Sequence, residues 1–213
     1  MQNDSINNHF KQAQIMIMNA KQHPGIQQKL IDWGYAIQHV SHGETFLNDA
    51  RLAQQFQKDT YHAKRDCDRQ WKNDWTLFQR QYAEHRAVAK TAFRNEPDTL
   101  QRLRVDRRAP KRMADLLDQA TDFYGALMGK SKEMQKFGIK ADELDQSQAM
   151  ITSLIDQQAQ RMQCKGNAES ATQKRNQALD ELRTWQREFI RVAKMALKDD
   201  SQLLEVLGVI VAA

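Results

Sequence analysis

Apolar residues recur at helical spacing in two well-separated stretches of the chain. In residues 113–127 this spacing predicts an amphipathic helix, whose apolar face carries Met113, Leu116, Leu117, Ala120, Phe123, Tyr124 and Leu127. A matching helix near the start carries Phe10, Ala13, Ile17 and Ala20. The helix-breaking residues His23, Pro24 and Gly25 follow the first stretch, and Met128 and Gly129 follow the second, so we expect both helices to end there.

The sequence also matches itself when it is shifted by 104 positions. The segment VAKTAFR at 88–94 lies over VAKMALK at 192–198, and Gly25 and Gly34 lie over Gly129 and Gly138. Glycines at the same offset point to bends that occur twice. We therefore predict a tandem duplication, with helical repeat 1 at residues 1–105 and helical repeat 2 at residues 106–213, folded together as one domain.

Each predicted repeat contains an unusually long helical stretch, at residues 44–94 and 142–198. The chain has no Gly or Pro between Gly43 and Pro97, and the middle segments 57–69 and 157–176 are almost wholly polar. Each stretch is either one continuous helix of about 50 residues or a helical hairpin that turns near Asp66 or Gly166. The gapless repeat favours the continuous helix, because surface loops tolerate insertions. Ser41 and Glu44 fit a capping box that opens the first of them.

Aromatic side chains form a stripe at helical spacing near the end of the first long stretch, at Trp71, Trp75, Phe78 and Tyr82. Leu179, Leu182, Gln186 and Phe189 occupy matching or neighbouring positions in the second. We interpret both stripes as the core where the long helices pack together. The predicted fold is all-α: each repeat is a short amphipathic helix plus one long helix, and the repeats pack with pseudo-two-fold symmetry into an elongated, coiled-coil-like helical bundle.

Composition agrees with helix and excludes several classes of protein. Eight Gly and three Pro in 213 residues are too few for a loop-rich or β-rich fold. Two cysteines are too few for a disulfide scaffold, and we expect Cys67 to be inert. The longest apolar run, residues 206–213, is too short to span a membrane and could dock on its own chain or on a neighbour. No signal peptide is evident, so we expect a cytoplasmic protein.

Searching for catalytic, cofactor and metal sites yields only weak candidates. Asp59, His62 and Asp66 share one helical face, as ligands do in metal-binding bundles. The positions 104 residues later are Gln163, Gly166 and Ser170, which are poor ligands, so a solvated polar face is the better interpretation. His39 and His42 fit exposed loop or capping residues. We predict no catalytic residue, no cofactor and no metal, and we lean against an enzyme.

The densest charge lies where the two predicted repeats join. The basic connector, residues 102–112, contains Arg102, Arg104, Arg107, Arg108, Lys111 and Arg112, in a chain of net charge +5. Such clusters bind acidic protein surfaces or phosphate backbones. The alternative is a solvated connector whose charges pair with Asp106 and Asp115 and favour solubility.

The aromatic-Gly step at Trp33 and Gly34, the long helix that ends in the Ala-Lys-Ala-type run at 89–94, and the closing Leu207 and Gly208 resemble uncharacterised bacterial all-helical tandem-repeat proteins of unknown function. The resemblance implies no activity. We expect a non-catalytic helical protein that acts in protein–protein interaction or scaffolding. The alternative is a nucleic-acid-associated protein that uses the basic connector. We expect an unidentified protein partner rather than nucleic acid, and no membrane; a homo-oligomer is left open.

Overall fold

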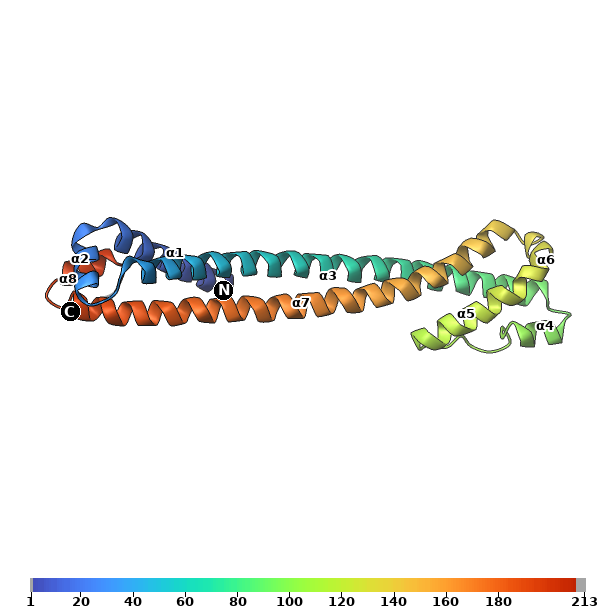
Figure 1. Ribbon diagram of the computed structural model, residues 1–213. Coiled ribbons are helices and arrows are strands. Elements are labelled where there is room, and N and C mark those ends of the chain that lie inside the picture. Colours follow the sequence, from blue (N-terminus) through green and yellow to red (C-terminus); the bar gives the residue numbers. More distant parts are fainter. Residues whose placement is uncertain (1, 210–213) are drawn as a thin grey trace. The chain divides into compact units, whose positions relative to one another are not determined.

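The computed structural model describes residues 2–209, and within them every regular element is helical. The elements are α1 (Gln2–Gln22), α2 (Pro24–Asp32), α3 (Ile37–Ala92), α4 (Pro97–Arg102), α5 (Met113–Leu127), the short 3-10 helix η1 (Met128–Lys130), α6 (Ser131–Gln135), α7 (Ala141–Ala196) and α8 (Ser201–Val206) (Figure 1). The predicted all-α class is confirmed.

The two long stretches are continuous helices. α3 and α7 each contain 56 residues, and neither turns at Asp66 or at Gly166. The hairpin alternative is therefore wrong. A Cβ atom added at Gly166 would meet no atom within 4 Å, so this glycine is not required by any close contact.

Helix boundaries and helix ends recur 104 residues apart. α3 and α7 begin at residues 37 and 141, and α4 and α8 begin at residues 97 and 201. Gly34 and Gly138 both have positive φ angles, of 75° and 92°. The amide of the residue after each glycine donates to the carbonyl five positions before it: Tyr35 to Leu30 at 2.8 Å, and Ile139 to Met134 at 3.2 Å. This hydrogen bond is typical of a Schellman motif at the end of a helix. The tandem duplication itself stays a prediction.

The chain folds as two compact units. Unit 1 comprises residues 2–62 and 166–209 of the described chain, and unit 2 comprises residues 63–165. Unit 1 therefore combines α1, α2 and the first part of α3 with the last part of α7 and α8 (Figure 1). Unit 2 combines the last part of α3 with α4, α5, η1, α6 and the first part of α7. Each unit thus takes its helices from both predicted repeats.

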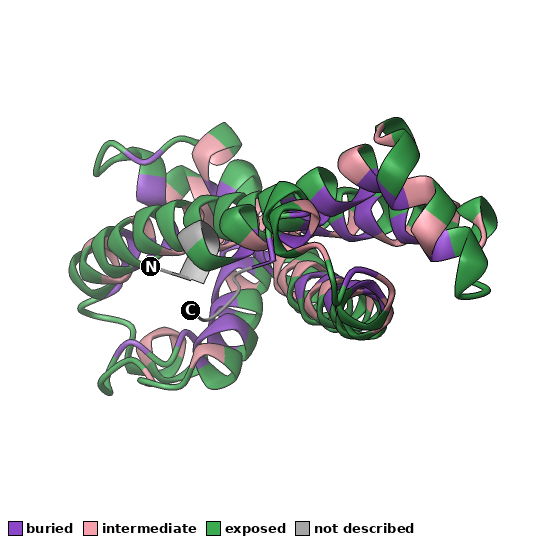
Figure 2. Ribbon diagram, turned by 90° about the vertical axis from the view of Figure 1, so that its left-hand side faces the viewer, coloured by how far each residue is buried: buried purple, intermediate pink, exposed green. Residues whose placement is uncertain are grey.

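The core of unit 1 is built by the apolar face of α1. Phe10, Ala13 and Ile17 are buried as predicted, and they belong to one cluster with Leu182 and Phe189 of α7. Figure 2 shows the buried positions in purple on helices whose other faces are green and exposed. After α8, residues 207 and 209 are also buried in this core, so the described part of the apolar tail docks on its own chain. Residues 210–213 lie outside the described part.

The core of unit 2 contains the predicted aromatic stripe. Phe78 and Tyr82 are buried against Phe123 and Tyr124 of α5, with a centroid distance of 5.3 Å between Tyr82 and Phe123. Trp71 and the neighbouring Trp75 are partly buried beside them. The stripe at 179–189 belongs to the core of unit 1 instead. Each stripe therefore lies in a core to which both long helices contribute, as predicted, but the two stripes belong to different cores.

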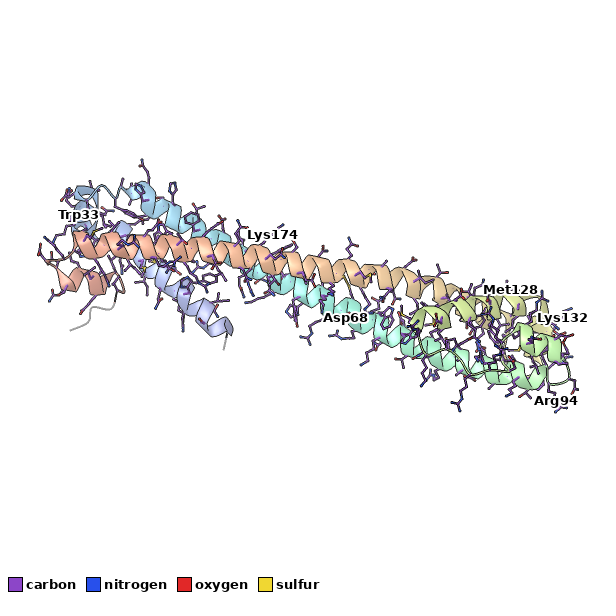
Figure 3. All side chains as sticks on the ribbon, turned by 90° about the horizontal axis from the view of Figure 1, so that it is seen from below. Trp33, Asp68, Arg94, Met128, Lys132 and Lys174 are labelled. Atoms are coloured by element: carbon purple, nitrogen blue, oxygen red, sulfur yellow. A yellow bond between two sulfur atoms is a disulfide. The ribbon has the colours of Figure 1, made fainter. Side chains whose placement is uncertain are left out.

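Two local predictions at the helix ends also need correction. α3 begins at Ile37, so Ser41 and Glu44 lie inside the helix and do not form its capping box. The helix begins early because the turn at Gly34 leads directly into it. Trp33, which precedes that turn, is half-exposed (Figure 3). α2 was not expected after the breaker residues; Pro24 opens it at a position where no backbone N–H is needed.

Candidate functional site

The basic connector is an irregular segment between α4 and α5 in unit 2. It begins at the end of α4 and reaches Arg112, which immediately precedes α5. The structure exposes all six basic residues that the sequence singled out: Arg102, Arg104, Arg107, Arg108, Lys111 and Arg112. Between them, Leu103 and Val105 are buried in the core of unit 2. The segment is thus anchored by apolar side chains while its charges face solvent.

Hydrogen bonds to backbone carbonyls hold the connector in place. The Nε2 amide of Gln119 on α5 donates to the carbonyl of Arg104 at 3.0 Å. Arg86 on α3 donates from Nη2 to the carbonyl of Arg107 at 2.6 Å. The amide of Val105 donates to the carbonyl of Leu100 at 3.1 Å. Two helices of unit 2 therefore fix the backbone that carries the basic side chains.

Arg104 adopts a backbone conformation that is unusual for a side chain larger than Gly. Its φ of 51° lies in the left-handed region, where a non-Gly residue loses about 1–2 kcal/mol. The residue ends α4 in the same way as Gly208, with φ of 73°, ends α8. Arg104 also forms an ion pair with Asp122 at 3.2 Å. The sequence contains no glycine here, so periodicity alone could not reveal this turn.

Only part of the connector's charge is neutralised within the described chain. Besides Arg104, Arg107 pairs with the adjacent Asp106 at 3.6 Å. The remaining four basic residues, Arg102, Arg108, Lys111 and Arg112, form no ion pair with any residue that the structure describes. The sequence-based alternative expected pairing with Asp106 and Asp115, and only the first of these pairs is present. The connector therefore presents four exposed cationic side chains without an ionic partner.

The weak metal candidate has local partners on α3. Asp59 accepts a hydrogen bond from Gln55 Nε2 at 2.9 Å, and Asp66 pairs with Arg69 at 3.0 Å. Across residues 2–209, no three His, Cys, Asp or Glu side chains are grouped so as to hold a metal ion. His39 and His42 are exposed, as expected, but both lie in the first turns of α3 rather than in a loop.

The cysteines form a disulfide, which corrects the expectation of an inert cysteine. Cys67 on α3 is bonded to Cys164 on α7, with Cα atoms 6.9 Å apart and a sequence separation of 97 residues. On the neighbouring turn, Arg161 donates from Nε to Asp68 at 3.0 Å. This hydrogen bond lowers the pKa of Asp68. The sequence could not pair the cysteines, because only the antiparallel alignment of the long helices brings them together.

A buried polar network in unit 2 was not expected from the sequence. His85 on α3 is fully buried, its Nδ1 lies 3.0 Å from the Tyr124 hydroxyl, and its Nε2 lies 3.1 Å from Glu143 Oε1. Burial raises the pKa of Tyr124. Because an ionised carboxylate only accepts, Nε2–H donates to Glu143, and the Nδ1 of a neutral imidazole then accepts from the Tyr124 hydroxyl. His85 continues the stripe of Phe78 and Tyr82 at helical spacing, and this signal could have placed it in the core.

Comparison of the chain with protein-family models, with curated proteins and with solved structures finds no match. Within residues 2–209, no helix combines the length and the apolarity that crossing a membrane requires. What the chain does must therefore be argued from its own side chains and their geometry.

Proposed function

We propose that the chain is a non-catalytic helical interaction protein, which uses the basic connector to bind an acidic surface of a protein partner. The observation that carries this proposal is the set of four exposed basic residues, Arg102, Arg108, Lys111 and Arg112, that have no ionic partner in the described chain. Exposed charges of this kind add little to folding, but they complement an acidic partner and speed its association.

The fixed backbone of the connector supports a binding role. Gln119 and Arg86 hold the carbonyls of Arg104 and Arg107, and Leu103 is buried. A segment that is already ordered loses less conformational entropy when it binds than a free loop would. The backbone that carries the basic side chains is therefore already ordered before a partner binds.

An acidic protein partner fits the charge distribution better than nucleic acid does. Asp106 lies among the basic residues, Asp98 and Asp115 flank them, and the whole chain carries a net charge of only +5. Nucleic-acid-binding surfaces usually concentrate basic charge on one face without such acidic neighbours. Nucleic-acid binding is the second candidate function, because the same four exposed cations are groups that contact phosphates.

The test compares two charge-matched variants of the full chain. The connector variant replaces the four unpaired basic residues by Gln (R102Q, R108Q, K111Q and R112Q). The control variant makes the same charge change elsewhere on unit 2, at the exposed residues Arg94, Lys132, Lys136 and Lys140 (Figure 3 labels the first two). Polyglutamate and a random-sequence DNA duplex serve as probes, each at several salt concentrations.

We expect the connector variant to lose about ten-fold or more in polyglutamate affinity, while the control variant changes little. Tighter binding of the duplex than of polyglutamate, with a steep salt dependence that the connector variant abolishes, would replace the proposal by the nucleic-acid alternative. Equal losses in both variants would show non-specific attraction and overturn both candidates.

A further inference from the structure

A cleft of about 650 Å3 lies in unit 1 between the start of α3 and the later turns of α7. Three aromatic side chains, Tyr35, Phe46 and Trp185, contribute to its walls, together with three carboxylates, Asp180, Glu181 and Glu188. Its volume falls in the range of about 300–1,000 Å3 that is usual for small-molecule sites. We call it the aromatic cleft.

Trp185 is held rigidly in this cleft. Its side chain is buried, its Nε1 donates to the carbonyl of His39 at 3.0 Å, and its ring stacks on Phe189 with centroids 5.3 Å apart. The ring lies directly on the backbone of α3 at Gly43, where an added Cβ would stand 2.1 Å from two ring carbons. Only glycine, which has no Cβ, therefore lets the Trp185 ring pack directly on the α3 backbone at this position.

The charge of the cleft is negative. The described residues that line it include three carboxylates and two histidines, His39 and His42, but no Lys or Arg. Asp180 is paired with Arg183 at 3.1 Å outside the cleft, and Glu181 accepts a hydrogen bond from Gln177 at 3.0 Å. Glu188 forms no ion pair with any described residue. Burial raises the pKa of Tyr35, and the nearby Glu188 charge raises it further. Glu188 is thus an unneutralised charge beside an aromatic ring.

Unit 2 has a cleft at matching positions with a different lining. It measures about 410 Å3. At the shift of 104 residues, Gln81 corresponds to Trp185 and Met150 corresponds to Phe46, and both line this cleft. Its one carboxylate, Asp74, already accepts a hydrogen bond from Gln157 at 2.8 Å. The aromatic and acidic lining is therefore a property of unit 1 and not a general result of how the long helices pair.

We propose that the aromatic cleft binds a small organic cation, an ammonium or guanidinium group attached to an apolar body. Aromatic walls attract a cation through the negative faces of their rings, and they bury the apolar body at the same time. The carboxylates neutralise the positive charge, and Glu188 is the one that neither pairs with a cation nor accepts a side-chain hydrogen bond within the described chain. An anion would meet three carboxylates, and a neutral ligand would leave Glu188 unpaired.

The first experiment uses the full chain and a pair of probes that differ in charge. Phenethylammonium and phenethyl alcohol have nearly the same size and shape, but only the first is cationic. The indole N–H signals of the four tryptophans, assigned by single Trp→Phe variants, report binding by NMR: Trp33 and Trp185 are in unit 1, and Trp71 and Trp75 are in unit 2.

We expect phenethylammonium to shift the Trp185 signal saturably, with a Kd of about 1 mM for so small a probe, and to leave the tryptophans of unit 2 unchanged. Phenethyl alcohol should bind about five-fold or more weakly. Glu188→Gln should weaken phenethylammonium binding by about five-fold, whereas Glu84→Gln, the matching position in unit 2, should leave it unchanged.

Three outcomes would overturn the proposal. The first is equal affinity for the two probes, because the charge would then not be recognised. The second is a Glu188→Gln variant that binds as tightly as the unmodified chain. The third is no saturable shift of the Trp185 signal by phenethylammonium; if a lysine-rich peptide shifts Trp185 instead, the cleft belongs to a protein interface.

Discussion

Replacing Gly43 by Ala should destabilise unit 1, although the same change stabilises most helices. Gly43 lies inside α3, where Ala is favoured over Gly by about 1 kcal/mol in an open position. Here the new methyl group would stand 2.1 Å from two carbons of the Trp185 ring and 2.6 Å from a third. The ring or the helix must therefore move.

The size of the effect follows from these contacts. Overpacking a buried site costs about 1–3 kcal/mol. Moving the ring also endangers the hydrogen bond from Trp185 Nε1 to the His39 carbonyl, which contributes about 1 kcal/mol. Subtracting the gain of about 1 kcal/mol in helix propensity leaves a net loss of about 1–3 kcal/mol in the free energy of unfolding. Trp185 cannot easily relieve the clash, because it is buried and stacked on Phe189.

Gly166 provides a matched control in the same unit. It lies inside α7, it is exposed, and an added Cβ would meet no atom within 4 Å. Gly166→Ala should therefore stabilise by about 1 kcal/mol. Urea unfolding, with hydrogen exchange to resolve unit 1 from unit 2, measures both variants. In a Trp185→Ala background the clash is gone, and Gly43→Ala should become stabilising by about the same amount. A Gly43→Ala effect of the same sign in both backgrounds would refute the reasoning.

Further predictions concern unit 2. Cys67→Ser, which opens the disulfide, should lower the free energy of unfolding by about 2–4 kcal/mol in denaturant titrations, and a reductant should reproduce the loss in the unmodified chain but not in the variant. Tyr124→Phe removes the donor to buried His85 Nδ1 and should cost about 1–2 kcal/mol in the same assay; an unchanged midpoint would contradict the network. Arg161 lowers the pKa of Asp68, so the stability contributed by Asp68 is present above its unfolded-state pKa and is lost as the pH falls through the lower folded-state value. Arg161→Gln should reduce this loss of stability at acid pH. An unaltered pH dependence of the free energy of unfolding would contradict this prediction.

The sequence predicted the helices well because their signals are local. The apolar faces of α1 and α5, the breaker residues after them and the absence of Gly and Pro between Gly43 and Pro97 all act within a few turns. The 104-residue offset even located the bends at Gly34 and Gly138, because a positive φ angle restricts the choice of residue there.

The partners of each helix could not be predicted in the same way. The aromatic stripe at 71–82 was correctly assigned to a core, but a stripe does not identify the helix that covers it. For the same reason the Cys67–Cys164 bond was missed, because it depends on the pairing of α3 with α7. The basic connector was found from its charge, whereas its fixed backbone depends on contacts from Arg86 and Gln119 that lie outside the segment.

The division of the chain into units has a consequence for the order of folding during synthesis. Unit 2 is one contiguous stretch, residues 63–165, so it can form its core as soon as that stretch leaves the ribosome. Unit 1 must wait, because its N-terminal helices pack on α7 residues that follow residue 165. Domains fold as units during translation. The α1 side chains therefore lack the α7 part of their core throughout the synthesis of unit 2, although the α2 and α3 residues of the same core are already present.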